Sequence, residues 1–469
     1  MKILIMKFGA SCLKNEISFK RINEITKIYE DSKKFYIISA FNGISDLLLN
    51  IANSITTANT KEIDNSLKKI KKIHVDVIEQ IFYKDSIYYR KVKDWIDLKL
   101  NELSNILAEI QEFGLEAYYL DHLYSFGELM ATYILCEYLQ SRGIDSLYVP
   151  ANQFLITDDN YNNAFPLYNL IENRIRNRII PILESNKKNI IFCITGFIGR
   201  NKIGNITTLG KGGSDYTATI LAHSLYEIGN DYDIRVILWK DVDGLFAINP
   251  KYIPDSNLIR NINYSEAKQF ANFGAKILHP KCLDALESKK IPLEIRNFNN
   301  PNEKVNYTLI SEYTDGNTIK GISAIENVSI ITITSGSMVD VPGVLAKIFK
   351  TLGKNGISVS LVSQSASEIS TSFVVKEEDC FKAIEALKSN SFFAKFFDIN
   401  FENIAIINIT GVNVLENRIK TRIFEILDKN NIQVRALSQS FDEINISLVV
   451  NRKKLIDAIK LIHDYIGKN

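Results

Sequence analysis

Near the start of the chain, short apolar runs alternate with stretches in which apolar residues return every three or four positions. Lys2–Phe8 and Phe35–Ala40 have the pattern of strands, whereas Asn15–Tyr29 and Ile44–Ile55 have helical spacing. Strands and helices in this order, joined by small-residue turns, predict an α/β fold with a mainly parallel sheet. Because ligands bind at the carboxyl ends of such strands, the turns that follow them are the expected location of a site.

The same alternation continues to about residue 300 and then changes. We expect a charged helical segment at residues 61–112 and another helix over Gly127–Arg142. The further strands that we expect are Ser146–Pro150, Asn189–Thr195, Ile234–Trp239 and Ile291–Phe298, the last being the final strand of this part. The polar stretch that follows, residues 301–326, predicts a linker.

A Gly-rich stretch, Thr195–Ala222, follows one of these strands. It predicts a hairpin and then a tight turn at Leu209–Gly213, with Ser214 and Asp215 as a helix N-cap. Glycines let backbone amides approach a ligand closely, and a helix N-terminus attracts anions. With Lys211 as a cation beside Asp215, the stretch suits a small zwitterion or a phosphate. An ordinary Gly-rich turn before a capped helix would have the same residues.

The last third of the chain contains an internal repeat with a spacing of about 75 residues. Residues 355–375 (NGISVSLVSQSASEISTSFVV) correspond to residues 430–450 (NNIQVRALSQSFDEINISLVV). The flanking apolar runs predict a β-α-β-β-α order in each copy. Copies this small bury little core alone, so we expect them to pack side by side.

The composition argues against several classes of protein function. The 469 residues are 46% hydrophobic and carry a formal net charge of +2, which gives no general attraction to nucleic acid or membrane. The five cysteines lack C-x-x-C spacing and the five histidines are scattered, so neither a disulfide framework nor a metal site is expected. The chain starts without a signal-peptide pattern and has no membrane-length apolar run, and we expect a cytoplasmic protein.

Charged residues stand beside several of the predicted turns at strand ends or helix starts. They are Lys7, Glu128, Lys211, Asp215, Asp241 and Lys276. Three cations and three carboxylates at one sheet edge suit a charged small molecule together with a nucleotide, as phosphoryl transfer requires. The sequence has no G-x-x-x-x-G-K-[ST] motif, and no G-x-G-x-x-G opens the first helix, which disfavours P-loop and Rossmann proteins.

Five motifs in order resemble those of aspartokinases. Lys7–Ser11 is similar to their KFGGTS start, and Ser125–Leu129 to S-x-G-E-L. The other three are Leu209–Tyr216, similar to LGRGGSDY, Lys240–Gly244, similar to TDVDG, and Phe273–Pro280, similar to FGAKVLHP. The repeat resembles the tandem ACT domains of the same family, so the resemblance covers nearly the whole chain.

The resemblance implies ATP- and Mg²⁺-dependent phosphorylation of the L-aspartate β-carboxylate to 4-phospho-L-aspartate, the first step toward lysine, threonine and methionine. It implies an amino-acid-kinase domain, a three-layer αβα sandwich, at residues 1–300. Two ACT-like regulatory domains of ferredoxin-like α+β fold are then expected at residues 327–395 and 396–469. The kinase half of threonine-sensitive bifunctional aspartokinase–homoserine dehydrogenases is especially similar, and we expect no dehydrogenase half here.

The resemblance also assigns residues to roles. Lys7 and Asp215 are the catalytic candidates. The aspartate-binding candidates are Ser45, Glu128, Lys211 and Ser214. The nucleotide-binding candidates are Lys7, Gly9, Ala10, Lys240, Asp241, Phe246, Lys251 and Lys276. No protein metal ligand is expected.

Six positions depart from the family pattern. Cys12, Phe126, Phe246 and Lys251 stand where the family has Ser, His, Tyr and Arg, and the other two departures bear directly on the site. Ala10 replaces the second Gly of KFGG, which would cost about 1 kcal/mol or more if that position required a positive φ. Lys211 replaces an Arg and therefore lacks the bidentate fork that suits a carboxylate.

The repeat implies regulation by an amino acid. Gln364 and Gln439, in matching Ser-Gln-Ser triplets, resemble the effector glutamines of threonine-sensitive enzymes, so threonine is expected as the inhibitor rather than lysine. Asp340–Gly343 resembles an ACT ligand loop that the second copy lacks. ACT domains of this family pair across subunits, and a homodimer or larger homo-oligomer is expected.

Two other functions stay open. One is a different kinase of the same fold, such as a glutamate or acetylglutamate kinase, although the repeat and Leu209–Tyr216 argue against it. The other is a sensor that binds amino acids without catalysis, against which the presence of Lys7, Glu128 and Asp215 argues.

Overall fold

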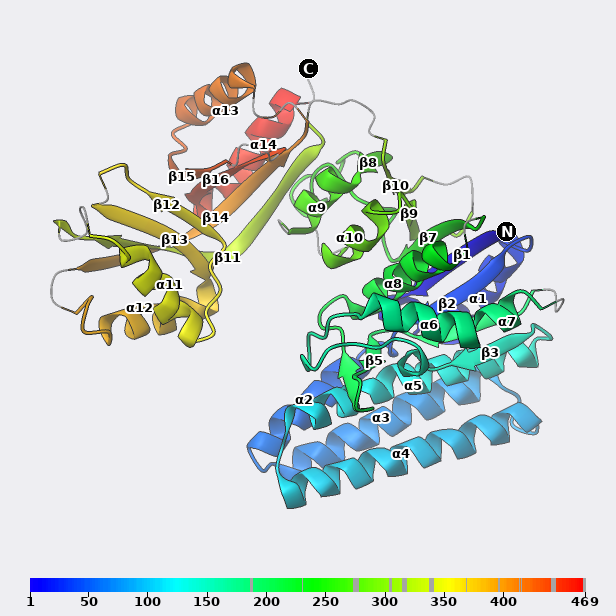
Figure 1. Ribbon diagram of the computed structural model, residues 1–469. Coiled ribbons are helices and arrows are strands. Elements are labelled where there is room, and N and C mark those ends of the chain that lie inside the picture. Colours follow the sequence, from blue (N-terminus) through cyan, green and yellow to red (C-terminus); the bar gives the residue numbers. More distant parts are fainter. Residues whose placement is uncertain are drawn as a thin grey trace. The chain divides into compact units, whose positions relative to one another are not determined.

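A computed structural model describes the chain except for residues 186–188, 230, 273–277, 303–305, 314–318, 337–340, 368, 395–396, 413, 415, 440–443 and 467–469. It divides into two compact units (Figure 1). The first consists of Met1–Leu245, Leu258–Tyr264 and Lys276–Tyr313, and the second of Phe246–Asn257, Ser265–Ala275 and Thr314–Asn469. Each unit is described separately below.

The first unit is built on an eight-stranded sheet of order β3-β4-β2-β1-β7-β9-β10-β8. The strands are β1 (Lys2–Phe8), β2 (Lys33–Ile38), β3 (Ser146–Val149), β4 (Ile191–Thr195), β7 (Asp233–Lys240), β8 (Asn261–Asn263), β9 (Leu293–Asn297) and β10 (Thr308–Ser311). All neighbouring pairs are parallel except β9 and β10. A separate hairpin consists of β5 (Ile198–Arg200) and β6 (Ile206–Thr208). The predicted mainly parallel sheet is confirmed.

Helices cover both faces of this sheet. One layer contains α6 (Tyr168–Arg178), α7 (Ile180–Leu183), α8 (Gly213–Ile228) and α10 (Lys281–Glu287). The other contains α1 (Glu16–Ile28), α2 (Ile44–Thr56) and α5 (Ala117–Ser141), with the long helices α3 (Thr60–Ile81) and α4 (Ile87–Phe113) packed outside them (Figure 1). The expected three-layer αβα arrangement is therefore present.

The alternation of side chains along β1 determines which residues point to each face of the sheet. Leu4, Met6 and Phe8 belong to the core shared with α1 and α5. Because successive side chains of a strand point to opposite faces, Lys7 points to the other face, which α8 covers. The same alternation applies to β7, where Trp239 belongs to that core and Lys240 faces α8.

Three sequence predictions need correction. Helix α5 begins at Ala117, ten residues before the predicted start, because its first turns are aromatic and pack inward. The predicted linker is partly structured: β10 joins the sheet of the first unit, where the hydroxyl of buried Thr308 donates to the Ile259 carbonyl, and β11 of the second unit begins at Gly321. Ser214 is not an N-cap, since α8 starts at Gly213 with Gly212 as its cap.

The second unit contains a six-stranded antiparallel sheet of order β12-β13-β11-β14-β16-β15. Its strands are β11 (Gly321–Thr334), β12 (Leu361–Gln364), β13 (Ser370–Lys376), β14 (Asp398–Thr410), β15 (Val434–Ser438) and β16 (Asn445–Asn451). Its helices are α11 (Val344–Lys354), α12 (Cys380–Lys388), α13 (Asn417–Lys429) and α14 (Leu455–Ile466), together with most of α9 (Tyr264–Asn272). Strands β11 and β14, the first of each copy, pair in the centre. The predicted β-α-β-β-α order and the side-by-side packing are both confirmed.

Within the part of the chain that the structure describes, none of the helices combines the length and apolar composition needed to cross a bilayer.

Candidate active site

Two lysines and one aspartate meet where β1 and β7 approach the start of α8. Lys7 Nζ lies 2.7 Å from Asp215 Oδ1, and Lys240 Nζ lies 2.8 Å from Asp215 Oδ2. Lys7 and Asp215 are buried, and the Lys240 side chain is 16% exposed. Strand alternation turns both lysines toward α8, and Asp215 occupies the first turn of that helix. This cluster lies at the carboxyl edge of the parallel sheet, where ligands are expected.

The cluster carries one more positive than negative charge, and this charge is held away from water. Burial would raise the pKa of Asp215, but the ammonium groups of Lys240 and Lys7 outweigh burial and lower that pKa to about 2. Burial lowers the pKa of Lys7 below its ordinary value, with Asp215 opposing the shift and Lys240 adding to it. Asp215 is therefore an ionised anchor between two cations and is unsuited to act as a general base.

The Gly-rich turn before α8 adopts a left-handed backbone conformation at two of its glycines. Gly210 and Gly212 have φ values of 75° and 76°, in the left-handed region that favours glycine. Lys211 lies between them and is exposed. Ser214, one residue before Asp215, is buried. The turn thus presents an exposed cation four residues before Asp215.

The start of α8 packs closely against the end of β4. A Cβ added at Gly196 would lie 2.6 Å from Ser214 Cβ and 3.0 Å from Ser214 Cα. We expect Gly196→Ala to shift the first turn of α8, lowering stability by about 1–3 kcal/mol and weakening substrate binding. Denaturant midpoints and Michaelis constants measure the two effects.

Gly353→Ala provides the matched control for this substitution. Gly353 lies inside α11, and an added Cβ there has no neighbour within 4 Å. Its replacement should leave activity unchanged and stabilise the helix by up to about 1 kcal/mol. If Gly196→Ala behaved like this control, the close packing of β4 against α8 would be unimportant.

Glu128 approaches the same edge from α5, on the opposite face of the sheet. It is buried, and burial raises the pKa of its carboxyl to about 8, although a backbone hydrogen bond with Ala40 and the charge of Lys7 act in the other direction. The helix reaches this position because residue 127 is glycine: a Cβ there would lie 2.7 Å from Ala40 Cβ. A buried carboxylate that forms no ion pair with another described residue suits a ligand that brings its own positive charge.

Other predicted residues of the first unit lie around this edge. Gly9 follows β1, and a Cβ added there would lie 3.4 Å from Lys7 Nζ. Ser45 is exposed in the first turn of α2, and Asp241 is exposed directly after β7. Ala10 belongs to a 3-10 turn, Ala10–Cys12, and is not among the residues with positive φ. The strain that we considered for Ala10 is therefore absent.

The remaining predicted residues lie elsewhere or outside the described part. Phe246 and Lys251 belong to the second unit, where Lys251 Nζ lies 2.9 Å from Glu326 Oε1. Gln364 ends β12 and is exposed, and the Gln439 side chain accepts a 3.4 Å hydrogen bond from Lys420 Nζ. Lys276 and Asp340, with residues 273–277 and 337–340, lie outside the described residues.

The geometry suits the transfer of an anionic group. Lys7 and Lys240 are preorganised cations in a region with little water, where charge stabilisation is most effective. Among the described residues, no group of three or more His, Cys, Asp or Glu side chains could hold a metal ion.

Comparison with known proteins agrees with this geometry. Residues 2–297 match the amino acid kinase family. The chain belongs to that family. Residues 328–390 and 407–465 match the ACT domain, so the two repeat copies of this amino acid kinase are of ACT type.

The chain also resembles individual proteins over nearly its whole length. It is 28% identical to the bifunctional aspartokinase/homoserine dehydrogenase of Buchnera aphidicola, a match that covers 98% of this chain and 56% of that protein. The chain therefore spans about half the length of that relative.

Two solved structures of E. coli aspartokinase III share its fold. The complex with aspartate and ADP (R-state) has a TM-score of 0.81 at 24% identity and covers 98% of this chain and 99% of that one. The complex with lysine and aspartate (T-state) has a TM-score of 0.80 at 23% identity and covers 99% of each chain.

Sequence reasoning missed one residue that supports the site of this kinase. Asp121, in α5, is fully buried and accepts hydrogen bonds from the Asn162 amide, the Thr208 amide (2.7 Å) and the Thr208 hydroxyl (2.9 Å). Thr208 directly precedes the Gly-rich turn, so Asp121 holds that turn against α5. The sequence contained one indication of this, a single carboxylate among aromatic and apolar residues in AYYLDHLYSF.

Proposed function

We propose that the chain phosphorylates the β-carboxylate of L-aspartate with ATP, forming 4-phospho-L-aspartate in the first step toward lysine, threonine and methionine. The observation that carries this proposal is the buried Lys7–Asp215–Lys240 cluster, with Glu128 approaching the same edge. Membership of the amino acid kinase family and similarity to aspartokinases over 98% of the chain support the choice of reaction and substrate.

The chemistry requires positioning more than proton transfer. The β-carboxylate of aspartate has a reference pKa of about 3.9, so it is ionised at neutral pH and needs no general base. Asp215 then serves to hold Lys7 and Lys240, whose charges face the phosphoryl group during transfer. Its low pKa keeps this anchor ionised throughout the physiological range.

The substrate's other groups need partners of opposite charge. We propose that Glu128 binds the aspartate ammonium and that Lys211 binds a carboxylate, with hydrogen bonds from Ser45 and Ser214. The buried position of Glu128 favours this assignment, because a substrate ammonium would compensate the cost of ionising it.

Further residues are proposed to contact the nucleotide. We propose that Lys7 and the amides of Gly9 and Ala10 contact the transferring phosphoryl group. The further candidates on this side are Lys240, Asp241, Phe246, Lys251 and Lys276. Mg²⁺ bound to ATP would neutralise phosphate charge. Lys7 and Lys240 suit ATP, since they supply two cations for its phosphate oxygens.

We further propose that the ACT pair mediates feedback inhibition by threonine, with Gln364 and Gln439 at the effector sites, in a homodimer or larger homo-oligomer. Both glutamines lie at or next to the end of the second strand of their copy, β12 and β15. One structural relative carries lysine, so lysine is the competing effector.

An ADP-release assay with aspartate, glutamate or no acceptor tests the catalytic proposal. We expect release that depends on aspartate, with kcat/KM for glutamate lower by at least about 10²-fold, since the extra methylene displaces the reacting carboxylate. Glutamate-dependent release would identify a different amino acid kinase, and an absence of release with both would identify a sensor.

The same assay, repeated with threonine and with lysine, tests regulation. Threonine should inhibit, and Gln364→Ala should weaken that inhibition while leaving kcat unchanged. Inhibition by lysine alone would contradict the assignment of the effector.

A further inference from the structure

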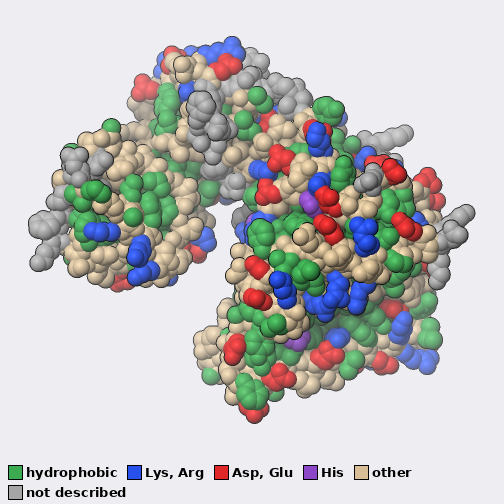
Figure 2. Space-filling view, in the orientation of Figure 1, with side chains coloured by type: hydrophobic (Ala, Val, Ile, Leu, Met, Phe, Trp, Pro, Cys, Tyr) green, Lys and Arg blue, Asp and Glu red, His purple; other side chains and the backbone are tan. Residues whose placement is uncertain are grey.

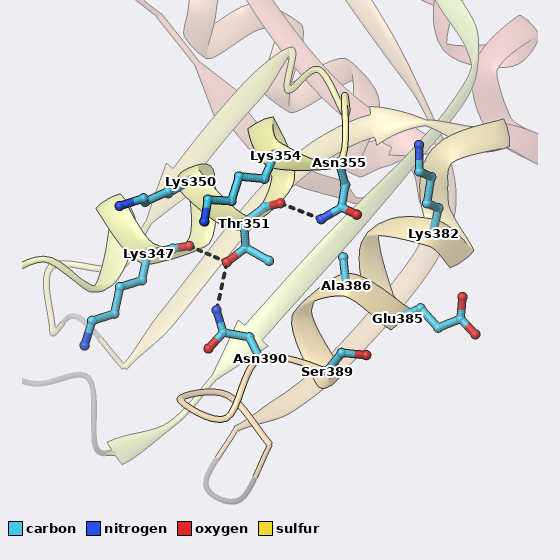
Figure 3. A pocket seen from close by; sticks show the side chains of 10 residues that line it. All are labelled: Lys347, Lys350, Thr351, Lys354, Asn355, Lys382, Glu385, Ala386, Ser389 and Asn390. Carbon is cyan, nitrogen blue, oxygen red and sulfur yellow. Dashed lines mark hydrogen bonds between the residues drawn. The ribbon is translucent and has the colours of Figure 1, made fainter.

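A polar hollow of about 550 Å³ lies between α11 and α12 in the first ACT copy (Figure 3). Four of its ten lining residues are lysines: Lys347, Lys350, Lys354 and Lys382. Figure 2 shows Lys and Arg atoms gathered over this part of the second unit. The only acidic residue in the lining is Glu385, so the hollow has a clear excess of positive charge.

The arrangement of the lysines follows from helix geometry. Lys347, Lys350 and Lys354 are spaced three and four residues apart, which places them along one face of α11. Lys382 comes from α12, on the other side of the hollow (Figure 3). Cations at these spacings repel one another, so the cluster reduces the stability of an isolated helix.

The floor between the two helices is polar and held by hydrogen bonds. Asn390 Nδ2 donates to Thr351 Oγ1 at 3.0 Å, and that hydroxyl donates to the Lys347 carbonyl at 2.8 Å. Asn355 Nδ2 donates to the Thr351 carbonyl at 2.9 Å. These contacts join α11 to the end of α12 and fix the base of the hollow.

Neighbouring groups do not balance the positive charge. Within the described part of the chain, none of the four ammonium groups has a carboxylate within ion-pair distance, although Lys347 Nζ lies 3.6 Å from the centroid of the Phe392 ring. The helix dipoles stabilise the positive charge at only some of these lysine positions. A cation is favourable at the C-terminal end, as for Lys354, but Lys347 and Lys382 occupy the first turns of their helices, where it is unfavourable.

The second ACT copy shows that this fold does not require the cluster. With the shift that aligns Asn355 with Asn430, Lys350 corresponds to Glu425 and Lys382 to Asp457. Glu425 forms an ion pair with Arg422, the counterpart of Lys347, at 3.0 Å. The corresponding charged positions there include three basic and three acidic residues: Arg422, Lys429, Lys460, Glu425, Asp457 and Asp464. The polar Thr351 is replaced by the apolar Ile426.

We propose that the hollow between α11 and α12 binds a small anion with two or more phosphate groups. Its volume is in the range of small-molecule sites, and lysines act as point charges for phosphate oxygens. The side-chain amides of Asn355 and Asn390 each keep a second hydrogen that can serve as a further donor. A nucleic acid is a poorer match, because the whole chain carries a net charge of only +2. The site is separate from the proposed catalytic residues and does not depend on their function.

Calorimetric titration of the full chain with inorganic pyrophosphate tests this proposal. Lys347→Gln/Lys354→Gln should weaken binding at least about tenfold, and Lys350→Gln/Lys382→Gln, which removes the other two cations, should do the same. Arg422→Gln/Lys429→Gln removes two cations at the corresponding places of the second copy and should change the affinity less than about twofold. Lys7→Met should retain the site, because it alters only the proposed phosphoryl site.

Parallel titrations with ADP and fructose 1,6-bisphosphate distinguish a nucleotide from a sugar phosphate as the source of the phosphates. The proposal would be overturned if Arg422→Gln/Lys429→Gln weakened pyrophosphate binding as much as the two double variants of the hollow do. It would also be overturned if neither double variant of the hollow changed the affinity. A duplex RNA that bound more tightly than pyrophosphate, through the same lysines, would also overturn it in favour of a nucleic-acid surface.

Discussion

Lys7→Met is expected to lower kcat by about a thousandfold, equivalent to about 4 kcal/mol of transition-state stabilisation. Lys7 is a buried cation whose ammonium lies next to Gly9 at the end of β1, and Met replaces it with an uncharged chain of similar length. The loss should appear in kcat more than in the KM for aspartate, because the charge acts on the transferring phosphoryl group. Steady-state ADP release with ATP and aspartate measures both constants.

Two features make this experiment interpretable. Asp215 keeps Lys240 as a partner when Lys7 is removed, so a buried unpaired carboxylate is not created and folding should be retained. Lys2→Met, at the exposed start of the same strand, is the matched control and should leave kcat unchanged. A Lys7→Met enzyme with more than a tenth of the original kcat would remove Lys7 from the catalytic residues.

Glu128→Gln is expected to lower kcat/KM for aspartate by about 10²- to 10³-fold at pH 8.5, because a buried charge-assisted contact with the substrate ammonium is lost. The size of the effect should depend on pH. Burial raises the pKa of Glu128 to about 8, so in the free enzyme the carboxyl is largely protonated at pH 6 and largely ionised at pH 9. Only the ionised form offers a negative charge to the ammonium.

The sign of the pH dependence follows directly. The ratio of wild-type to Glu128→Gln kcat/KM should increase by about tenfold from pH 6 to 7 and by about fivefold from pH 7 to 8, and it should level off above the pKa. The ratio removes pH effects that the two enzymes share, including titration of ATP. A ratio that stayed constant between pH 6 and 9 would rule out Glu128 as the ammonium ligand.

Glu137→Gln separates the loss of a buried carboxylate from the loss of this particular one. Glu137 lies on the same helix, is buried and pairs with Lys91 at 2.7 Å, away from the predicted site residues. Its replacement should lower stability while kcat/KM per folded enzyme is retained. Equal kinetic damage from both substitutions would point to α5 packing as the cause.

The sequence predicted those parts of the fold that depend on local pattern. Short apolar runs identified the strands around Lys7, and period-3.6 spacing identified the helices that follow them. The 75-residue shift identified two copies of one β-α-β-β-α unit, because each copy repeats the same apolar positions. Where the pattern was polar and short, as in β10, it predicted a linker instead of a strand. The first ten residues of α5 were missed because they are rich in aromatic residues that show no clear helical spacing.

Much of the candidate site was also visible as residue types beside turns, but their pairing was not. Lys240 was predicted on the nucleotide side, and the structure pairs it with Asp215. That contact depends on the parallel register of β1 and β7 and on the packing of α8 across them. The hydrogen bonds of Asp121 to Thr208 likewise join residues far apart in sequence.

The sequence alone therefore determined the order of the elements, the two-copy C-terminal region and the identity of the charged residues at the turns. These depend on spacing within a few residues, which local conformation controls. Only the tertiary structure decided which charges share a buried environment: one aspartate between two lysines, Glu128 shielded from water, and four lysines around one hollow. Such environments arise when distant elements pack, and the pKa shifts that follow from them belong to the folded chain.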